Sequence, residues 1–288
     1  MDFAEGFALP RRRFGRRRAP LDAFLALLFA AFSFRLLSSA HSGPCIRVRR
    51  SSDNALTDIG FVGGWLDVAA LLAFVGAGSG YVVTWYDQSG HGRHITYAAA
   101  AGQPRLVNAG VLDIAPNGRP SMTMGAGKML AAAALSAGMP AGAADHSIVA
   151  VTALTLAQGA GQWRYAVAYG GTATFSDPGI GLNTTNNFAA VALGGAAAAI
   201  ATSAAPALRF CAADFKGGTT VTTTLDGASA TQAMSYAIAS PGTLVVGGRP
   251  AGAVSWYEPV GEVLLMSGTT PELRAYLRAS CQTAWGTP

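Results

Sequence analysis

The fold is decided by the stretch YVVTWYDQSGHGRH, residues 81–94, where a run of β-branched and aromatic residues ends in a polar, glycine-rich break. Valine, threonine, tyrosine and tryptophan favour extended strands, whereas Asp and Gly favour turns. We therefore expect a strand over residues 81–86 and a tight turn after it. The Asp87 and Gln88 side chains should accept hydrogen bonds from turn amides, and the glycines should take unusual backbone angles.

Runs of similar character recur along the chain with turns such as Asp226-Gly227 between them. This spacing indicates a β-sandwich or jelly roll rather than a fold of alternating strands and helices. The predicted strands are residues 44–49, 147–154, 163–169, 188–193, 208–213, 219–225, 243–247 and 261–266. A short helix is expected at residues 66–75. A second, with a capping box from Thr269 to Glu272, is expected to close the chain.

The chain divides by composition into residues 1–40, a basic arm with an apolar segment, and residues 41–288, the sandwich domain. The net charge of +5 comes from the arm. Its six arginines are Arg11, Arg12, Arg13, Arg16, Arg17 and Arg18. Without them, 14 of the 20 basic residues remain against 15 acidic ones. The domain is therefore nearly neutral, and we expect no specific nucleic-acid recognition by it.

The apolar segment, residues 23–34, is expected to form an N-terminal helix. Three interpretations stay open: a buried helix or assembly anchor, an export signal, and a membrane-surface anchor. The uncharged stretch between Asp22 and Arg35 is shorter than the roughly 20 residues that span a bilayer.

Metal and thiol chemistry are poorly supported by the sequence. Cys45, Cys211 and Cys281 form no C-x-x-C pair, so neither a disulfide framework nor a zinc site is indicated, and we expect buried free thiols. His91 and His94 lie on a glycine-rich turn without a second ligand motif. We predict no metal and no cofactor.

Two groups of residues carry a resemblance to a known family. Residues 85–94 with Gln103-Pro104-Arg105 resemble concanavalin A-like (laminin-G-like) lectin and glucanase domains. His41-Ser42-Gly43 and residues 49–53 are similar to arabinofuranosidase B-type catalytic domains, and residues 245–249, 256–258 and 261–263 resemble the close of the same fold. The resemblance implies an all-β, concanavalin A-like sandwich with an N-terminal helix and a short C-terminal helix.

The resemblance also implies a retaining glycosidase with two carboxylates about 5 Å apart. The family's acid/base aspartate follows a Gly-Gly pair, and here Arg249 follows Gly247-Gly248. Its nucleophile segment corresponds to residues 175–187, which offer only Asp177. Residues 165–168 lack the family's vicinal cysteines. We therefore expect no catalytic residues. Glu262 should be structural, and Glu258 supplies half of a pair.

A sugar site on a sandwich usually combines an aromatic plate with a few planar polar groups. The candidate carbohydrate-binding residues are Arg249, Trp256, Tyr257, Glu258, Asn183 and Asn186. The alternative for Trp256 and Tyr257 is edge packing, and the alternative for Glu258 is a solvated loop residue. The guanidinium of Arg249 would favour an acidic sugar.

The leading hypothesis is a non-catalytic carbohydrate-binding adsorption protein, a fibre, spike or tail component of a phage or phage-like particle. It would sit on the virion surface, bind a cell-surface polysaccharide or glycan, form a homo-oligomer, and contact other virion proteins through the N-terminal segment. One alternative is an exported or cell-surface arabinofuranosidase-like glycoside hydrolase. The other is a purely structural virion decoration protein.

Overall fold

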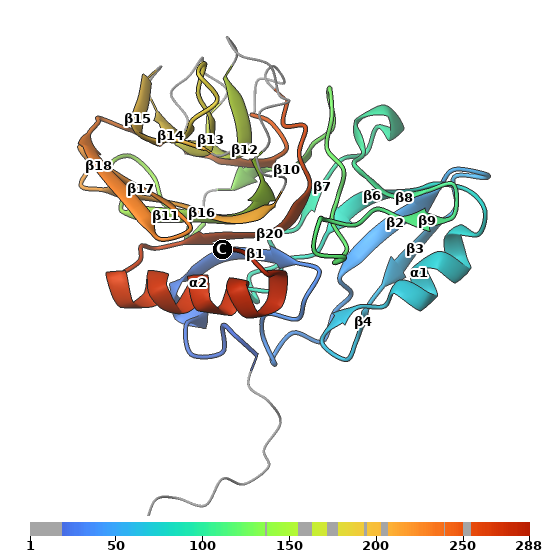
Figure 1. The fold of residues 1–288 in the computed structure, drawn as a ribbon. Coiled ribbons are helices and arrows are strands. Elements are labelled where there is room, and N and C mark those ends of the chain that lie inside the picture. Colours follow the sequence, from blue (N-terminus) through green and yellow to red (C-terminus); the bar gives the residue numbers. More distant parts are fainter. Residues whose placement is uncertain are drawn as a thin grey trace, which may run out of the picture.

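The part of the chain that the structure describes forms a β-sandwich with two α-helices on its periphery (Figure 1). The computed structural model describes residues 19–135, 137–154, 163–171, 178–192, 195–202, 207–238, 240–249 and 255–288. Within them, two antiparallel sheets of six and twelve strands pack face to face, and a third sheet has two strands. The predicted concanavalin A-like sandwich is confirmed. The arm arginines, Arg11 to Arg18, lie outside the described residues.

The six-stranded sheet joins the start of the described chain to its end. Its order is β1 (Leu28–Ser33), β20 (Val260–Met266), β11 (His146–Ala153), β16 (Leu208–Lys216), β17 (Thr220–Leu225) and β18 (Ala228–Ala233). Strands β11 and β20 are buried along their whole length because the other sheet covers one face and a helix lies over the other.

The twelve-stranded sheet carries the polar turns that the sequence singles out. Its order is β15 (Gly195–Ile200), β14 (Phe188–Ala192), β13 (Gly179–Leu182), β12 (Arg164–Gly170), β19 (Gly242–Val246), β10 (Leu130–Leu135), β7 (Ile95–Thr96), β6 (Gly80–Trp85), β2 (Ile46–Arg50) and β3 (Leu56–Ile59). Strand β8 (Arg105–Asn108) pairs with β6 and with β9 (Val111–Leu112), while β4 (Phe61–Val62) and β5 (Trp65–Leu66) form the small sheet.

The core lies between the two sheets. The Trp85 ring, at the end of strand β6, stacks on Phe34 with centroids 5.1 Å apart, and its centroid lies 5.8 Å from that of Phe32. All three side chains are fully buried. Burying each contributes on the order of 2 to 3 kcal/mol through the hydrophobic effect.

The expected N-terminal helix is wrong. Leu25–Leu27 make a single 3-10 turn, and Leu28–Ser33 form strand β1, which pairs with β20 from Leu28–Met266 to Ser33–Glu262. Leucine and alanine favour a helix in isolation, but pairing with a neighbouring strand overrides that preference. The apolar segment is therefore covered by the domain itself. Among the described residues, no helix has the length and apolarity needed to cross a membrane.

The expected C-terminal helix is confirmed as α2 (Pro271–Trp285), which runs along the outside of the six-stranded sheet (Figure 1). Its N-cap is Thr270, whose hydroxyl accepts a hydrogen bond from the Leu273 amide, and not Thr269 as the sequence suggested. Thr269 instead donates to Asp214. The expected short helix is α1 (Val68–Val75), and Ala100–Gly102 add a 3-10 turn.

Candidate functional site

The turn at residues 87–94 is structural, as predicted. Asp87 accepts hydrogen bonds from the backbone amides of Ala31, Ser89 and Arg93 at 2.9 to 3.0 Å. Gln88 accepts from the Leu37 amide, which lies outside the turn, so the expected hydrogen bond from a turn amide is wrong for this residue. The two side chains therefore fasten strand β1 and the segment after it to β6.

Gln88 also donates to the carbonyls of Ser33 and Arg35, so its amide group is used in full. Gly90 and Gly92 have φ values of 91° and 68°, as expected for the turn. Among the described residues, no group of His, Cys, Asp and Glu is arranged to hold a metal ion. The three cysteines are free and buried, and burial raises the pKa of each thiol well above its usual value.

The second polar region lies at the end of β19, where the sequence placed Arg249. Gly247 donates to the Ala166 carbonyl of β12 and accepts from the Trp256 amide. Its φ is 94°, and a Cβ there would lie 2.7 Å from the Lys128 carbonyl oxygen. A glycine is thus required where three chain segments meet. Arg249 follows at once and is buried.

The segment Ser255–Pro259 brings an exposed tyrosine and a buried carboxylate beside this end of the sheet. Tyr257 is 42% exposed, and the Arg164 guanidinium lies 4.7 Å from its ring centroid. Arg164 also reaches the Ser255 carbonyl. Glu258 is only 7% exposed. We define the candidate site as Arg164, Tyr165, Arg249, Tyr257 and Glu258.

Trp256 does not provide the expected sugar platform. It is fully buried, and its indole Nε1 donates to Thr152 Oγ1 at 2.9 Å. A ring without an exposed face cannot stack on a sugar, so the packing alternative holds for this residue. Tyr257 is the exposed aromatic of the pair.

Tyr165 is part of the candidate site and is not among the residues that the sequence predicted. It is fully buried, and it packs over β13 with Ala168 and Trp163, apart from the main core. A Cβ on Gly179 would lie 2.8 Å from the Tyr165 ring, and one on Gly181 would lie 1.7 Å from the Arg164 carbonyl oxygen. Two glycines two residues apart in a strand indicate a close approach on one face, and that signal could have found Tyr165.

The asparagines lie in the turn between β13 and β14, and Asn183 shapes it. Its Oδ1 accepts from the amides of Thr185 and Asn187 and from the Thr185 hydroxyl. Asn186 has a φ of 59° and is mostly buried. Because Leu182 pairs with Arg164, the turn lies at the same end of the sheet as the candidate site. A role in sugar binding remains a prediction for both.

The carboxylates of the chain can be sorted by what they contact. Of the 15 acidic residues, Asp2, Glu5 and Asp177 lie outside the described residues. Ion pairs with arginine hold Asp53, Asp58, Asp113, Asp214, Asp226 and Glu262. Hydrogen bonds to backbone amides hold Asp22, Asp67, Asp87 and Asp145. Glu272 lies on the first turn of α2. Among the described carboxylates, Glu258 alone belongs to the candidate site.

Comparison with known proteins connects the first part of the chain to a family of enzymes. Residues 27–139 match the family model for the catalytic domain of alpha-L-arabinofuranosidase B. The probable alpha-L-arabinofuranosidase B of Aspergillus clavatus is 41% identical over 70 residues, which cover 24% of this chain and 14% of that protein. The alpha-L-arabinofuranosidase of Hypocrea jecorina is 41% identical over 69 residues with the same coverage. The alignments thus span a small part of these relatives.

Solved arabinofuranosidase structures superpose on most of this chain. An arabinofuranosidase complexed with arabinofuranosyl-alpha-1,2-xylobiose superposes with a TM-score of 0.64 and 17% identity, covering 91% of this chain and 64% of that one. A GH54 α-L-arabinofuranosidase soaked with a cyclic sulfate inhibitor superposes with a TM-score of 0.65 and 18% sequence identity, with the same coverage of both chains. At this identity the likeness establishes the shared fold.

These findings contradict the leading hypothesis from the sequence. A non-catalytic phage adsorption protein is wrong as the main interpretation, because the matched model and the similar proteins are arabinofuranosidases. The virion location likewise has no support. The model match ends at residue 139, so the candidate site lies in the part of the chain that only the fold comparison covers.

Proposed function

We propose that this chain is a glycoside hydrolase of the α-L-arabinofuranosidase type, which removes a terminal arabinofuranosyl group from a polysaccharide. The observation that carries the proposal is the match of residues 27–139 to the catalytic-domain model, and the shared sandwich fold supports it. A polysaccharide substrate lies outside cells, so the proposed location is secreted.

Hydrolysis of a glycosidic bond by this class of enzyme uses two carboxylates. Glu258 is the proposed first, because it is the described carboxylate that belongs to the candidate site. Between residues 19 and 288, Asp177 is the single acidic residue outside the described part, so it is the proposed second. It directly precedes Pro178 and strand β13, whose glycines pack against Tyr165.

Arg249 stands where the family resemblance implies the acid/base aspartate. A guanidinium keeps its proton near neutral pH and cannot act as a general acid. In the proposed mechanism Glu258 therefore transfers the proton, and Asp177 attacks or stabilises the anomeric carbon. Arg249 and Tyr257 supply a hydrogen-bond donor and an exposed ring to the sugar.

Turnover of 4-nitrophenyl α-L-arabinofuranoside by the full chain tests the proposal. Because general acid-base catalysis contributes about 10² to 10⁴ in rate, Glu258→Gln should lower kcat by at least about 100-fold. Asp177→Asn should also lower kcat, because the reaction needs the second carboxylate. Glu272→Gln, the same change at an exposed position on α2, should leave kcat unaltered. Unfolding midpoints of all variants separate a catalytic loss from a folding defect.

The variant Arg249→Asp distinguishes this mechanism from loss of activity during divergence. If Glu258 transfers the proton, the wild-type chain is active and Arg249→Asp gains nothing. An inactive wild type that becomes active as Arg249→Asp would overturn the proposed role of Glu258. It would show instead a hydrolase scaffold that had lost its acid.

A further inference from the structure

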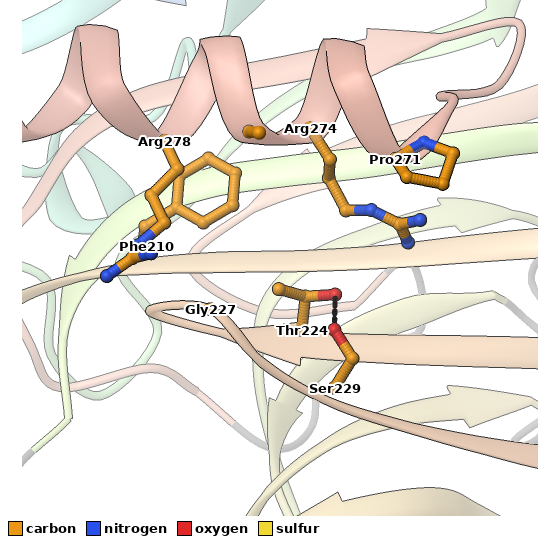
Figure 2. A pocket seen from close by; sticks show the side chains of 8 residues that line it. Phe210, Thr224, Gly227, Ser229, Pro271, Arg274 and Arg278 are labelled. Atoms are coloured by element: carbon orange, nitrogen blue, oxygen red, sulfur yellow. Dashed lines mark hydrogen bonds between the residues drawn. The ribbon is translucent and has the colours of Figure 1, made fainter.

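A cavity of about 230 Å³ lies between helix α2 and the hairpin of strands β17 and β18 (Figure 2). Arg274 and Arg278, one helical turn apart, extend from α2 toward it, while Thr224 and Ser229 face it from the hairpin. It lies at the six-stranded sheet, whereas the candidate site lies at the twelve-stranded sheet. The cavity is therefore a separate place in the molecule.

The two arginines differ in how their charge is balanced. Arg274 forms an ion pair with the buried carboxylate of Asp214, which also accepts hydrogen bonds from Ser147 and Thr269. This network fixes Arg274 and neutralises it. Among the described residues, Arg278 forms no ion pair with an Asp or Glu side chain. Its Nη2 donates to the Pro288 backbone oxygen at 3.5 Å, and its Nε is buried without a hydrogen-bond partner. The cavity is therefore lined by one guanidinium whose charge no described Asp or Glu side chain balances.

The hairpin is shaped to leave room for Arg278 and to offer a hydroxyl. Gly227 has a φ of 118°, and a Cβ there would lie 2.6 Å from Arg278 Nη1, so a side chain would displace the guanidinium. Thr224 and Ser229 are joined hydroxyl to hydroxyl at 2.8 Å. One of them donates in that bond, which leaves the hydrogen of the other able to point into the cavity.

We infer that this cavity binds one oxyanion group, the carboxylate of an acidic sugar or an inorganic phosphate. A guanidinium presents its N–H donors in a fork that matches either group, and a partly buried guanidinium is more strongly attractive than one in water. The volume accommodates one sugar ring or one phosphate. Pro271 and Ala275 add apolar side chains to the lining, which suit the apolar C–H faces of a sugar.

Calorimetric titration of the full chain with glucuronate, phosphate and glucose tests the inference. We expect glucuronate, phosphate or both to bind, and glucose to give no signal. Binding by one of the two anions identifies the source of the oxyanion. Equal responses to all three compounds, or none, would contradict the inference.

Variants locate the site. Arg278→Gln should weaken anion binding by about tenfold or more. Arg278→Lys should weaken it less, because lysine keeps the positive charge and loses only the forked arrangement of N–H donors. Lys216→Gln removes the same charge from the far end of β16 and should leave binding unchanged. Unchanged affinity in Arg278→Gln would place the anion elsewhere and refute the assignment. Arabinofuranoside turnover should be the same in all three variants, so this result stands apart from the proposed hydrolysis.

Discussion

Arg35 and Glu262, separated by 227 residues, form a buried two-pronged ion pair in which Arg35 Nε lies 2.6 Å from Oε2 and Nη2 lies 2.8 Å from Oε1 of Glu262. Ser33 and the Trp285 indole donate to the same carboxylate. The pair therefore ties β1, β20 and helix α2 together. It confirms that Glu262 is a structural residue.

Glu262→Gln should destabilise the fold by about 3 to 5 kcal/mol, because it leaves the Arg35 charge buried without its partner. Burial alone would raise the pKa of Glu262, but the Arg35 guanidinium and the hydrogen bonds outweigh it and hold the pKa below its ordinary 4.5. The wild-type pair therefore stabilises the protein above pH 4.5 and loses this contribution as the pH falls further.

Urea unfolding of both proteins near neutrality and in acid measures this effect. The difference in the free energy of unfolding between the wild type and Glu262→Gln should become smaller in acid. Asp53→Asn, which breaks an exposed ion pair with Arg50, is the control and should leave the unfolding midpoint unchanged. A pH-independent gap would contradict the prediction.

His146 should make the protein less stable as the pH falls from 6.5 to about 4. Its ring stacks on Phe215 with centroids 4.5 Å apart, and burial lowers its pKa from 6.5 to about 4. In that range the unfolded chain binds a proton at this histidine and the folded protein does not. The free energy of unfolding therefore falls by up to about 3 kcal/mol across the range. His146→Phe keeps the ring and removes the titration, so thermal unfolding midpoints of this variant should fall less across the same range.

Substitutions at Trp256 and Tyr257 should affect different properties. The first should lower the stability of the fold, and the second should weaken substrate binding. Trp256→Ala removes a fully buried side chain and should cost about 3 to 5 kcal/mol in urea unfolding. Tyr257→Ala removes an exposed ring and should leave the unfolding midpoint near that of the wild type while raising KM for the aryl arabinofuranoside. An unaltered KM would remove Tyr257 from the proposed site.

A substitution at Phe32 tests whether strand β1 is part of the core. The Phe32 side chain is fully buried against Trp85, so Phe32→Ala should destabilise the domain by about 3 to 5 kcal/mol. Leu27, five residues earlier, is 36% exposed, and Leu27→Ala should have a smaller effect. If urea unfolding showed equal and small effects, the segment would not be part of the core.

The sandwich could be predicted because its strands are runs of residues that favour extended structure, and each run is followed by residues that favour turns. The run ending at Trp85 and Tyr86 is rich in residues that favour strands, and Asp87 with its glycines ends it, so both strand and turn follow from local preferences. Helix α2 was predictable for the same reason, since Leu273, Leu277 and Cys281 recur on one face. Strand β1 was not, because its leucines and alanines are extended through their pairing with β20.

The candidate site could be predicted only in part. Arg249, Tyr257 and Glu258 lie close in sequence and were identified from it. Arg164 and Tyr165 come from another strand, and only the sheet register brings them there. The burial of Trp256 also depends on a distant partner, Thr152, so nothing in the local sequence separated a core tryptophan from a binding one.

The pairing of β1 with β20 has a consequence for synthesis. Ser33 and Glu262 are 229 residues apart, so at about 5 to 20 residues per second the ribosome needs on the order of ten seconds or more to supply the partner of the first strand. During that time the nascent chain carries an unpaired apolar strand edge. The six-stranded sheet can therefore be completed only after β20 has been synthesised.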